Sequence, residues 1–218
     1  MGEDKAMEVR QSGYRLYGWK LTGSLAIEAA FAEAGVGFDY VPVSRKTDEN
    51  LTEAYRRINP RQQLPALRLP DGSHIAEGPA ILLHIADAFP QAGLAPQAGS
   101  IDRAHHDRWL SFFQANVYEG ELRKLFPARY TTDPDSAASV KDAADSYVEQ
   151  HYRIFEESLG DGPYYFGGRF SVLDIYVWML AQWMPQDWLA EACPKVKRLS
   201  DTTARRPKIA PVHAFHFG

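Results

Sequence analysis

A proline at the start of an apolar run is the first feature of the sequence with chemical consequences. The stretch QQLPALRLPDG, residues 62–72, predicts a buried strand that is closed by its PDG turn. Pro65 cannot donate a hydrogen bond to a neighbouring strand, so it belongs at the first residue of a strand, on a sheet edge or at a cis bend. Pro65 therefore either starts the strand and does nothing more, or forms a cis bond that turns the Leu64 backbone outward. In the second case the N–H and C=O of Leu64 are left for a ligand.

Two predicted helix starts carry polar groups that could bind or activate a ligand. Thr22 and Ser24 stand at the start of a predicted helix, where a hydroxyl most often serves as the N-cap. The residues EGP, 77–79, precede another helix, whose free N–H groups and dipole favour a carboxylate. The Glu77 side chain can accept a hydrogen bond from an ammonium group, or it can serve only the electrostatics of the helix start.

Charge and the remaining motifs argue against several classes of function. The 218-residue chain has a formal net charge of −4, which disfavours nucleic acid or an anionic membrane as a partner. The sequence has no GxGxxG after a strand and no P-loop, so we expect no nucleotide cofactor. His105-His106 and His213-x-x-His216 lack companion ligands at metal-site spacing, so we expect no metal.

The sequence predicts a cytoplasmic protein. It contains no apolar run of the roughly 18 residues needed to span a membrane. The first 13 residues, MGEDKAMEVRQSG, lack the apolar core of a signal peptide. The single cysteine, Cys193, cannot form an internal disulfide, which fits a reducing compartment.

The elements that must position these groups alternate between strand and helix in the first 90 residues. Apolar residues at helical spacing predict a helix over residues 22–34, between strands at 14–18 and 38–43. Pro42 places the second of these strands at a sheet edge. The segment 48–58 predicts a polar helix, the PDG turn joins two antiparallel strands, and a helix follows from Gly78. The strand–helix–strand unit implies a parallel pair, so the four-stranded sheet should be mixed.

The rest of the sequence predicts helices alone. PQAGLAPQAGS, residues 90–100, has the composition of a linker. The segment FSVLDIYVWML, 170–180, is apolar all round after Ser171, so its helix should lie in a core, and Ser171 and Asp174 are spaced as a capping box. The predicted organisation is therefore a flexible N-terminal extension over 1–13, an α/β domain over 14–89, a linker over 90–100 and an all-helical domain over 101–218.

Four stretches together resemble the glutathione transferase family, and its bacterial, beta-like and theta-like members in particular. The resemblance covers nearly the whole chain from residue 14 and implies a thioredoxin-like N-terminal domain followed by an all-helical domain. It also implies that the Leu64–Pro65 bond is cis and that the Leu64 backbone pairs with the cysteinyl backbone of glutathione. The stretches are LYGWKLTGSLA (16–26), NPRQQLPAL (59–67), DGSHIAEGPAI (71–81) and FGGRFSVLDI (166–175).

The resemblance further implies which residues activate the glutathione thiol. The serine that donates to the sulfur in theta-like and zeta-like members aligns with Thr22, and Ser24 is the next hydroxyl. The cysteine of the beta class aligns with Gly23. Thr22 or Ser24 is therefore the expected donor to the thiolate, with Thr22 preferred, and the absent cysteine weakens any mechanism based on a mixed disulfide.

The family pattern also suggests residues that bind the rest of glutathione. Glu77 and Gly78 would hold the γ-glutamyl end, although the family usually has a serine where this chain has Gly78. Lys46 would extend toward the glycyl carboxylate, or it is equally a solvated loop charge. Gln63, next to Leu64, could reach the peptide backbone.

A small hydrophobic electrophile is the expected second substrate, bound between the two domains. Four aromatic residues are candidates to contact it, although core packing is the commoner role for such side chains. Tyr118 stands where beta-class members carry a histidine, and its hydroxyl could assist the leaving group. The four are Trp19, Trp109, Phe112 and Tyr118.

The expected function is that of a glutathione S-transferase, a cytoplasmic homodimeric enzyme of detoxification. Glutathione would be its co-substrate, without metal, nucleotide, nucleic-acid or membrane partners. Two alternatives stay open at this point. One is a glutathione-dependent peroxidase, dehalogenase or isomerase that uses the same thiolate, and the other is a non-catalytic binding protein with this fold.

Overall fold

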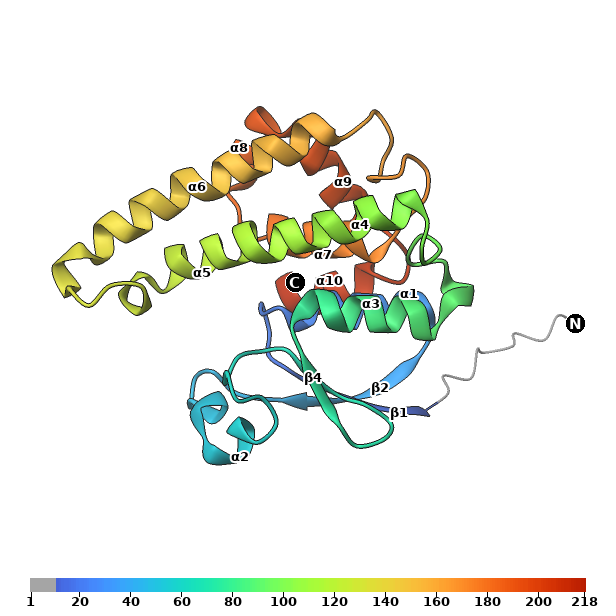
Figure 1. Cartoon of the computed structure of the whole chain (residues 1–218), viewed down its shortest axis with the longest axis horizontal. Helices are drawn as coiled ribbons and strands as arrows, with labels where there is room; N and C mark the ends of the chain where they lie inside the picture. Colours follow the sequence, from blue (N-terminus) through green and yellow to red (C-terminus); the bar gives the residue numbers. More distant parts are fainter. Residues whose placement is uncertain (1–10) are drawn as a thin grey trace, which may run out of the picture. The chain divides into compact units, whose positions relative to one another are not determined.

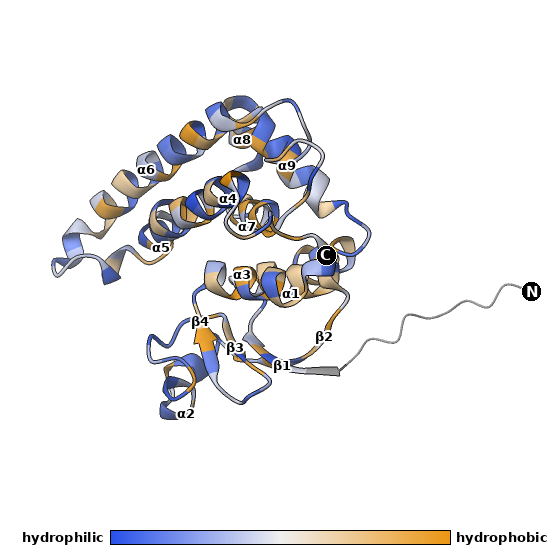
Figure 2. Ribbon diagram, turned by 45° about the vertical axis from the view of Figure 1, so that its right-hand side comes forward, coloured by the Kyte–Doolittle hydropathy of each residue, from blue (hydrophilic) through white to orange (hydrophobic). Residues whose placement is uncertain are grey.

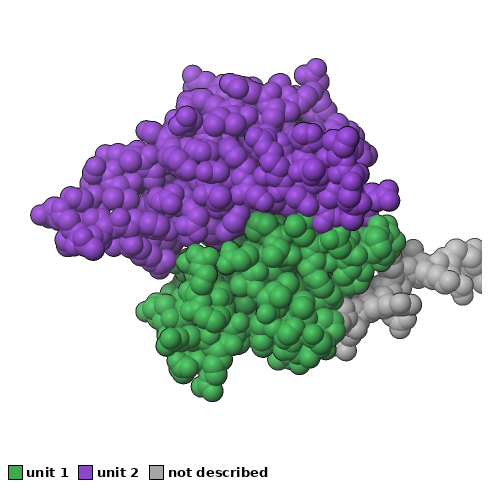
Figure 3. All heavy atoms as spheres, viewed as in Figure 1, with its two compact units in different colours: residues 1–92, 211–218 green, residues 93–210 purple. Residues whose placement is uncertain are grey.

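The computed structural model describes residues 11–218, drawn as a cartoon in Figure 1. The chain divides into two compact units, coloured separately in Figure 3. Of the described residues, the first unit holds 11–92 and 211–218, and the second holds 93–210. Residues 211–218, expected in the helical domain, group instead with the first unit. The N-terminal extension expected over residues 1–13 lies mostly outside the described residues, and the first strand already begins at Gln11.

The first unit is built on a four-stranded mixed sheet with the order β2-β1-β3-β4. The β1–β2 pair is parallel and the other two pairs are antiparallel, which confirms the predicted arrangement. Strand β2, which ends at Pro42, lies at the sheet edge as predicted. The elements are β1 (Gln11–Gly18), α1 (Ser24–Ala34), β2 (Gly37–Pro42), η1 (Glu49–Leu51), α2 (Glu53–Arg56), β3 (Ala66–Arg68), β4 (His74–Ala76), α3 (Gly78–Ala88), η2 (Pro90–Ala92) and α10 (Ala210–Phe217).

Helices α1 and α3 lie side by side over one face of this sheet, with α2 beyond the other face (Figures 1 and 2). Figure 2 shows that apolar residues predominate in both α1 and α3. Ile27 and Phe31 of α1 and Ile81 and Ile85 of α3 are fully buried. This apolar layer explains why the helical spacing of the sequence predicted these two helices correctly.

The predicted helix over residues 48–58 is broken in the structure. A 3-10 turn, η1, is separated from the four-residue helix α2 by Thr52, whose backbone is extended. The Thr52 hydroxyl accepts a hydrogen bond from the N–H of Tyr55, so it caps a new helix instead of continuing the first. The prediction of a single helix was wrong because this local cap competes with helix propagation.

The second unit is entirely helical apart from two isolated β-bridges, as expected. One segment, η3, is a π-helix that connects α4 to α5. No helix within residues 11–218 is both long and apolar enough to cross a membrane. The elements are α4 (Ile101–Phe112), η3 (Phe113–Tyr118), α5 (Glu119–Leu125), η4 (Pro127–Arg129), η5 (Pro134–Ser136), α6 (Ala137–Ser158), α7 (Val172–Ala181), α8 (Gln186–Ala192) and α9 (Pro194–Ala204).

Helix α7 forms the core of the second unit, and all ten of its residues are buried. Its start is held by the Asp174 carboxylate, which accepts hydrogen bonds from the Ser171 N–H at 2.8 Å and the Ser171 hydroxyl at 3.0 Å. The other carboxylate oxygen accepts from the Tyr165 N–H at 2.9 Å. The predicted capping box is confirmed. Burial raises the pKa of Asp174 to about 6, although these hydrogen bonds oppose the rise.

A second buried carboxyl, Glu121 on α5, should make the stability of the fold depend on pH. Its side chain is fully buried, and Oε1 accepts a hydrogen bond from Lys124 Nζ at 3.4 Å. Burial raises the pKa of Glu121 from 4.5 to about 7, although Lys124 opposes the rise. From pH 4.5 to 7 the unfolded chain has released a proton that the folded chain retains. The free energy of unfolding should therefore fall as the pH rises through this window, by roughly 3 kcal/mol from this residue.

Replacing Glu121 by glutamine should remove that part of the pH dependence. Glutamine keeps the shape of the side chain and cannot ionise, so the variant should gain stability relative to the original chain above pH 7. Urea unfolding at pH 4.5, 6 and 8 measures the effect. Glu157→Gln, an exposed change of the same charge on α6, is the matched control. Parallel pH curves for Glu121→Gln and the original chain would contradict the assignment.

Candidate functional site

The bend before β3 leaves a stretch of backbone without partners. The Leu64–Pro65 bond is cis, as predicted. Among residues 11–218, neither the N–H nor the C=O of Leu64 makes a hydrogen bond. Two groups capable of pairing with an extended peptide are therefore presented together at one residue.

Three side chains that the sequence did not single out hold the backbone that leads into this bend. The C=O of Gln63 accepts from the Tyr55 hydroxyl and from Asn59 Nδ2, each at 2.8 Å. The C=O of Gln62 accepts from Asn50 Nδ2 at 2.9 Å. Gln62 itself has φ of 55°, a conformation that few residues adopt without support. These hydrogen bonds fix the backbone that precedes Leu64. Tyr55 and Asn59 are buried in the folded chain, and no local sequence pattern indicated their contacts.

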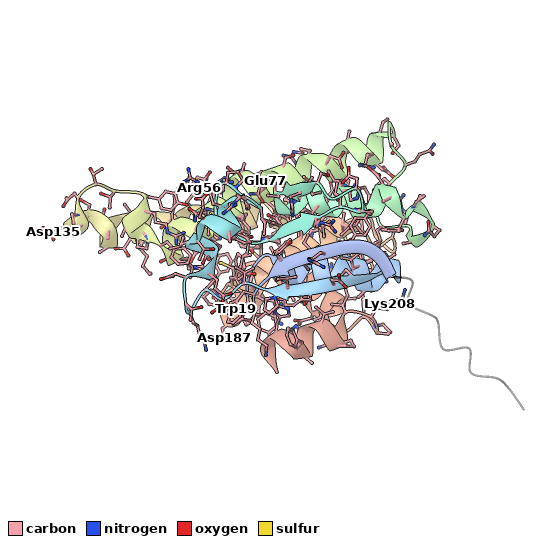
Figure 4. All side chains as sticks on the ribbon, turned by 90° about the horizontal axis from the view of Figure 1, so that it is seen from below. Trp19, Arg56, Glu77, Asp135, Asp187 and Lys208 are labelled. Atoms are coloured by element: carbon pink, nitrogen blue, oxygen red, sulfur yellow. The ribbon has the colours of Figure 1, made fainter. Side chains whose placement is uncertain are left out.

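The start of α3 presents a cation and an anion together. Glu77, labelled in Figure 4, is the residue before the first helical residue Gly78, and no side chain caps the helix. Glu77 Oε1 accepts a hydrogen bond from Arg61 Nη1 at 3.0 Å, and both side chains are about half exposed. Arg61 was missed because it lies 16 residues before its partner. The pair can meet both charges of an α-amino acid group, whose carboxylate also suits the N-terminus of the helix.

Two other predicted binding residues lie in the same unit. The Lys46 side chain is exposed in the turn between β2 and η1. Gln63 is half-buried beside Leu64, and its backbone is tied down as described above.

Thr22 and Ser24 differ in exposure. Thr22 retains 7% exposure, and its hydroxyl donates to the C=O of Trp19 at 2.8 Å. Ser24 is fully buried, and its hydroxyl lies 3.0 Å from Glu28 Oε1 and 3.2 Å from the C=O of Trp19. A Cβ atom on Gly18 would approach the Ser24 Cβ to 2.5 Å, so β1 and α1 are in close contact over this serine. Thr22 is therefore the better placed of the two hydroxyls to meet a ligand.

Neither Thr22 nor Ser24 is the N-cap of α1. Gly23 takes that position, with helical φ and ψ and no side-chain cap. Glu28, one helical turn after Ser24 on the buried side of α1, also contacts His216 of α10. The spacing of Ser24 and Glu28 could have indicated their contact. Nothing local in the sequence indicates the contact with His216, which lies 188 residues away.

The aromatic candidates for the second substrate fall into separate groups. Trp109 is 2% exposed, packs edge-on against Phe112 and Phe155 with ring centroids 4.9 Å apart, and donates from Nε1 to the Tyr165 hydroxyl. It is thus a core residue of the second unit. Phe112 is partly exposed beside it.

Tyr118 belongs to a different aromatic group, at the end of the π-helical segment η3. Its ring stacks on Tyr176, with centroids 6.5 Å apart and planes 7° apart, and contacts the ring of Trp183. The Tyr176 hydroxyl hydrogen-bonds to Gln114, also in η3. Trp19, labelled in Figure 4, lies in the first unit and packs against the core that includes Leu64.

Cys193 is not a candidate nucleophile, and the described residues include no metal-ligand cluster. Cys193 is buried, and burial raises the pKa of its thiol to about 12, so it stays protonated. Within residues 11–218, no three His, Cys, Asp or Glu side chains are grouped as metal ligands would be.

Comparisons with known proteins agree in both halves of the chain. Residues 24–88 match the glutathione S-transferase N-terminal domain and residues 122–212 match the glutathione S-transferase C-terminal domain. Glutathione S-transferase GstA of Escherichia coli O157:H7 is 31% identical over 162 residues, which are 73% of this chain and 77% of that protein. The chain belongs to the glutathione transferase family.

Solved structures place this glutathione transferase among bacterial relatives. A glutathione transferase homologue from Sulfitobacter, with bound glutathione, has a TM-score of 0.86 and 26% identity, and the match covers 94% of this chain and 98% of that one. A sphingomonad glutathione S-transferase complexed with glutathione has a TM-score of 0.78 and 30% identity, covering 93% and 98%. Maleylacetoacetate isomerase of Pseudomonas aeruginosa is 24% identical over 204 residues, 89% of this chain and 92% of that protein. The first unit is thus the thioredoxin-like domain of the family, and the second is its helical domain.

Proposed function

We propose that this glutathione transferase joins glutathione to a small hydrophobic electrophile, and that Thr22 stabilises the glutathione thiolate. The observation that carries the proposal is the unpaired backbone of Leu64, which offers one donor and one acceptor to the cysteinyl residue of the tripeptide. Thr22 and Ser24, the candidates to activate the sulfur, belong to the same unit as Leu64. The charged pair of Arg61 and Glu77 belongs to that unit too.

The γ-glutamyl end of glutathione would bind at the start of α3. Its ammonium group would pair with Glu77, and its carboxylate with Arg61 and with the N–H groups of the uncapped helix. Lys46 would extend toward the glycyl carboxylate, and Gln63 toward the peptide backbone. These contacts hold the peptide without involving its sulfur.

The thiol requires a donor because its ordinary pKa of about 8.5 leaves only about 3% as thiolate at neutral pH. The Thr22 hydroxyl now donates to the C=O of Trp19, and it can turn to donate to a bound sulfur instead. A hydrogen bond to a charged acceptor is roughly twice as strong as one to a neutral acceptor. Ser24 is fully buried and lies 3.0 Å from the Glu28 carboxylate, so its proton is already engaged.

In the conjugation step the thiolate attacks the electrophilic carbon. A sulfur–carbon bond forms, and the bond to the leaving group breaks with its electron pair going to that group. Tyr118 of the second unit is the residue that we propose to assist the leaving group by donating from its hydroxyl. Phe112 in the same unit and Trp19 in the first are the further candidates to contact the electrophile, whereas Trp109 supports Phe112 from the core.

The proposal extends to a homodimer in the cytoplasm with a role in detoxification. A single cysteine, buried and protonated, suits a reducing compartment. The homodimer rests on the resemblance to the family, and size-exclusion chromatography with light scattering would test it.

Retention on immobilised glutathione tests the proposed function directly. The protein should bind the resin, elute with free glutathione, and consume glutathione when 1-chloro-2,4-dinitrobenzene is added as an activated aryl chloride. Failure to bind the resin, together with no thermal shift in millimolar glutathione, would favour a non-catalytic binding protein with this fold.

Replacing Glu77 by glutamine should weaken glutathione binding about tenfold, with little change in kcat. The substitution removes the charge that meets the ammonium group, and charge-assisted hydrogen bonds contribute roughly 1.5–3 kcal/mol, less when half exposed as here. Calorimetric titration with S-methylglutathione, which lacks the free thiol, measures the peptide contacts alone. Glu53→Gln, an exposed residue of α2, is the control. Equal affinities for the two variants would contradict the assignment of Glu77.

Isomerisation of a double bond is the second candidate activity. The similarity to maleylacetoacetate isomerase, over 92% of its length, favours it. In such a reaction the thiolate would add to the double bond and leave again, so glutathione would not be consumed. Measuring the free thiol during turnover of a cis-configured unsaturated diacid distinguishes isomerisation from conjugation.

A further inference from the structure

The C-terminal helix supplies a buried histidine to the turn that carries Thr22. His216 on α10 is 5% exposed and belongs to the same compact unit as that turn. Its Nδ1 accepts a hydrogen bond from the N–H of Leu21 at 3.1 Å. Its Nε2 lies 3.2 Å from Glu28 Oε2. The histidine pair at 213 and 216 lacks the spacing of a metal site. One member, His216, instead has two hydrogen-bond partners, in the Leu21 turn and in α1.

The partners of His216 determine its tautomer. A backbone N–H can only donate, so Nδ1 must be unprotonated where it faces Leu21. The proton of the neutral ring then lies on Nε2, from which it is donated to the Glu28 carboxylate. The imidazole therefore accepts from the turn with one nitrogen and donates to α1 with the other.

The residue that His216 holds has an uncommon backbone conformation. Leu21 has φ of 60°, in the left-handed region that bulky residues seldom occupy. Its side chain is 50% exposed, so burial of that side chain does little to hold the conformation. The next residue is Thr22. The Nδ1 contact is consequently a restraint on the backbone that immediately precedes the thiol-activating hydroxyl.

The second contact of His216 reaches the neighbouring hydroxyl. Glu28 Oε2 faces His216, and its other oxygen lies 3.0 Å from the Ser24 hydroxyl. The Ser24 oxygen is 3.3 Å from Thr22 Oγ1. A carboxylate held in this position attracts the Ser24 proton, and Ser24 thus links Glu28 to Thr22. A further contact, between Lys20 Nζ and the ring of Phe215 at 4.6 Å, also ties the turn to α10.

We propose that His216 is a positioning residue that α10 contributes to thiol activation, by holding the Leu21–Thr22 turn through Nδ1. The inference rests on the proposed function and extends it to the C-terminal helix, whose role the sequence analysis did not identify. His216 itself does not touch glutathione. Its effect reaches the sulfur through the placement of Thr22, and small displacements of a catalytic group cost large factors in rate.

Two conservative substitutions separate the contacts of His216. In His216→Asn the amide oxygen can take the place of Nδ1 and accept from Leu21, but the side chain is too short to reach Glu28. In His216→Gln the amide can take the place of Nε2 and donate to Glu28, but no acceptor faces Leu21. His216→Phe removes both contacts, and Ala214→Ser is a control on the exposed side of α10.

The expected result is a loss of about tenfold in kcat for His216→Phe and His216→Gln, with most of kcat restored in His216→Asn. The Kd for S-methylglutathione should stay within twofold of the original chain in every variant, because Leu64 and Glu77 hold the peptide. Thermal unfolding of each variant identifies any that fails to fold, and the Asn and Gln variants are then compared with each other.

Other outcomes would overturn the inference. If His216→Gln keeps full kcat while His216→Asn loses it, the contact with Glu28 matters and the contact with Leu21 does not. If all three variants keep full kcat, His216 has no positioning role, although the proposed function stands. If the original chain neither binds S-methylglutathione nor turns over the aryl chloride, the proposed function fails, and the inference with it.

Discussion

Replacing Thr22 by alanine should slow conjugation about tenfold at pH 7, and the deficit should shrink as the pH approaches 9. Lowering the pKa of the bound thiol from about 8.5 to about 6.5 requires roughly 2.7 kcal/mol of thiolate stabilisation. The N-terminus of α1 supplies about 0.3–1 kcal/mol. A hydroxyl that donates to a charged sulfur supplies roughly 1.5–3 kcal/mol, so the hydroxyl should dominate.

The size of the effect has an upper limit. A shift of two pKa units raises the thiolate fraction at pH 7 from about 3% to about 75%, a gain of roughly 25-fold. Near pH 9 glutathione ionises without help, so the Thr22 hydroxyl contributes less. The pH profile of kcat, measured with saturating glutathione from pH 6 to 9, should therefore converge for the two proteins at its alkaline end.

Two further variants serve as controls for the Thr22 assignment. Thr22→Ser keeps the hydroxyl and should retain most of the activity. Ser24→Ala removes a fully buried hydroxyl whose proton is engaged by Glu28, so it should change kcat far less than Thr22→Ala. A larger loss in Ser24→Ala than in Thr22→Ala would transfer the donor role to Ser24. Equal and small losses in both would leave backbone N–H groups as the donors.

Replacing Asp174 by alanine should lower the free energy of unfolding by about 3 kcal/mol while leaving the KM for glutathione unchanged. The substitution leaves two buried donors, the N–H and hydroxyl of Ser171, and one part-buried donor, the N–H of Tyr165, without an acceptor. Each unsatisfied buried donor costs roughly 1–3 kcal/mol. Relief from burying a carboxyl, whose pKa burial raises to about 6, offsets part of that cost.

Urea denaturation and steady-state kinetics test the assignment of Asp174 together. Asp174→Asn, which keeps one acceptor, should cost about half as much stability. Asp133→Ala is the control, since Asp133 makes similar capping contacts at the exposed start of η5 and should cost well under 1 kcal/mol. A stable Asp174→Ala variant that had lost turnover would show that Asp174 acts in catalysis rather than in the fold.

The elements that local patterns encode were predictable from the sequence. The structure confirms the apolar spacing of α1, the edge position of the strand with Pro42 and the capping box at Ser171. Each of these depends on one residue or on residues that are close in the sequence. The helix expected over 48–58 was wrong because Thr52 caps a new helix within it. The additional hydrogen bond from Tyr165 to Asp174 was beyond any local pattern, because it comes from outside the helix.

The candidate site was predictable only in part, for the same reason. The bend at Leu64 and the acid at Glu77 lie in short motifs, whereas Arg61 reaches Glu77 from a separate loop. Thr22 is more exposed than Ser24 because β1 approaches α1 closely over Ser24. The spacing of residues along the chain does not show this approach. The His216 contact joins residues 195 positions apart, and only the folded chain brings them together.

The ultraviolet absorbance of the thiolate, titrated against pH in the saturated complex of the protein with glutathione, tests the central claim most directly. The account predicts a midpoint near pH 6.5 for the original chain, about two units below that of free glutathione, and a midpoint closer to that of free glutathione for Thr22→Ala. A saturated complex of the original chain that titrates at about pH 8.5 would contradict it.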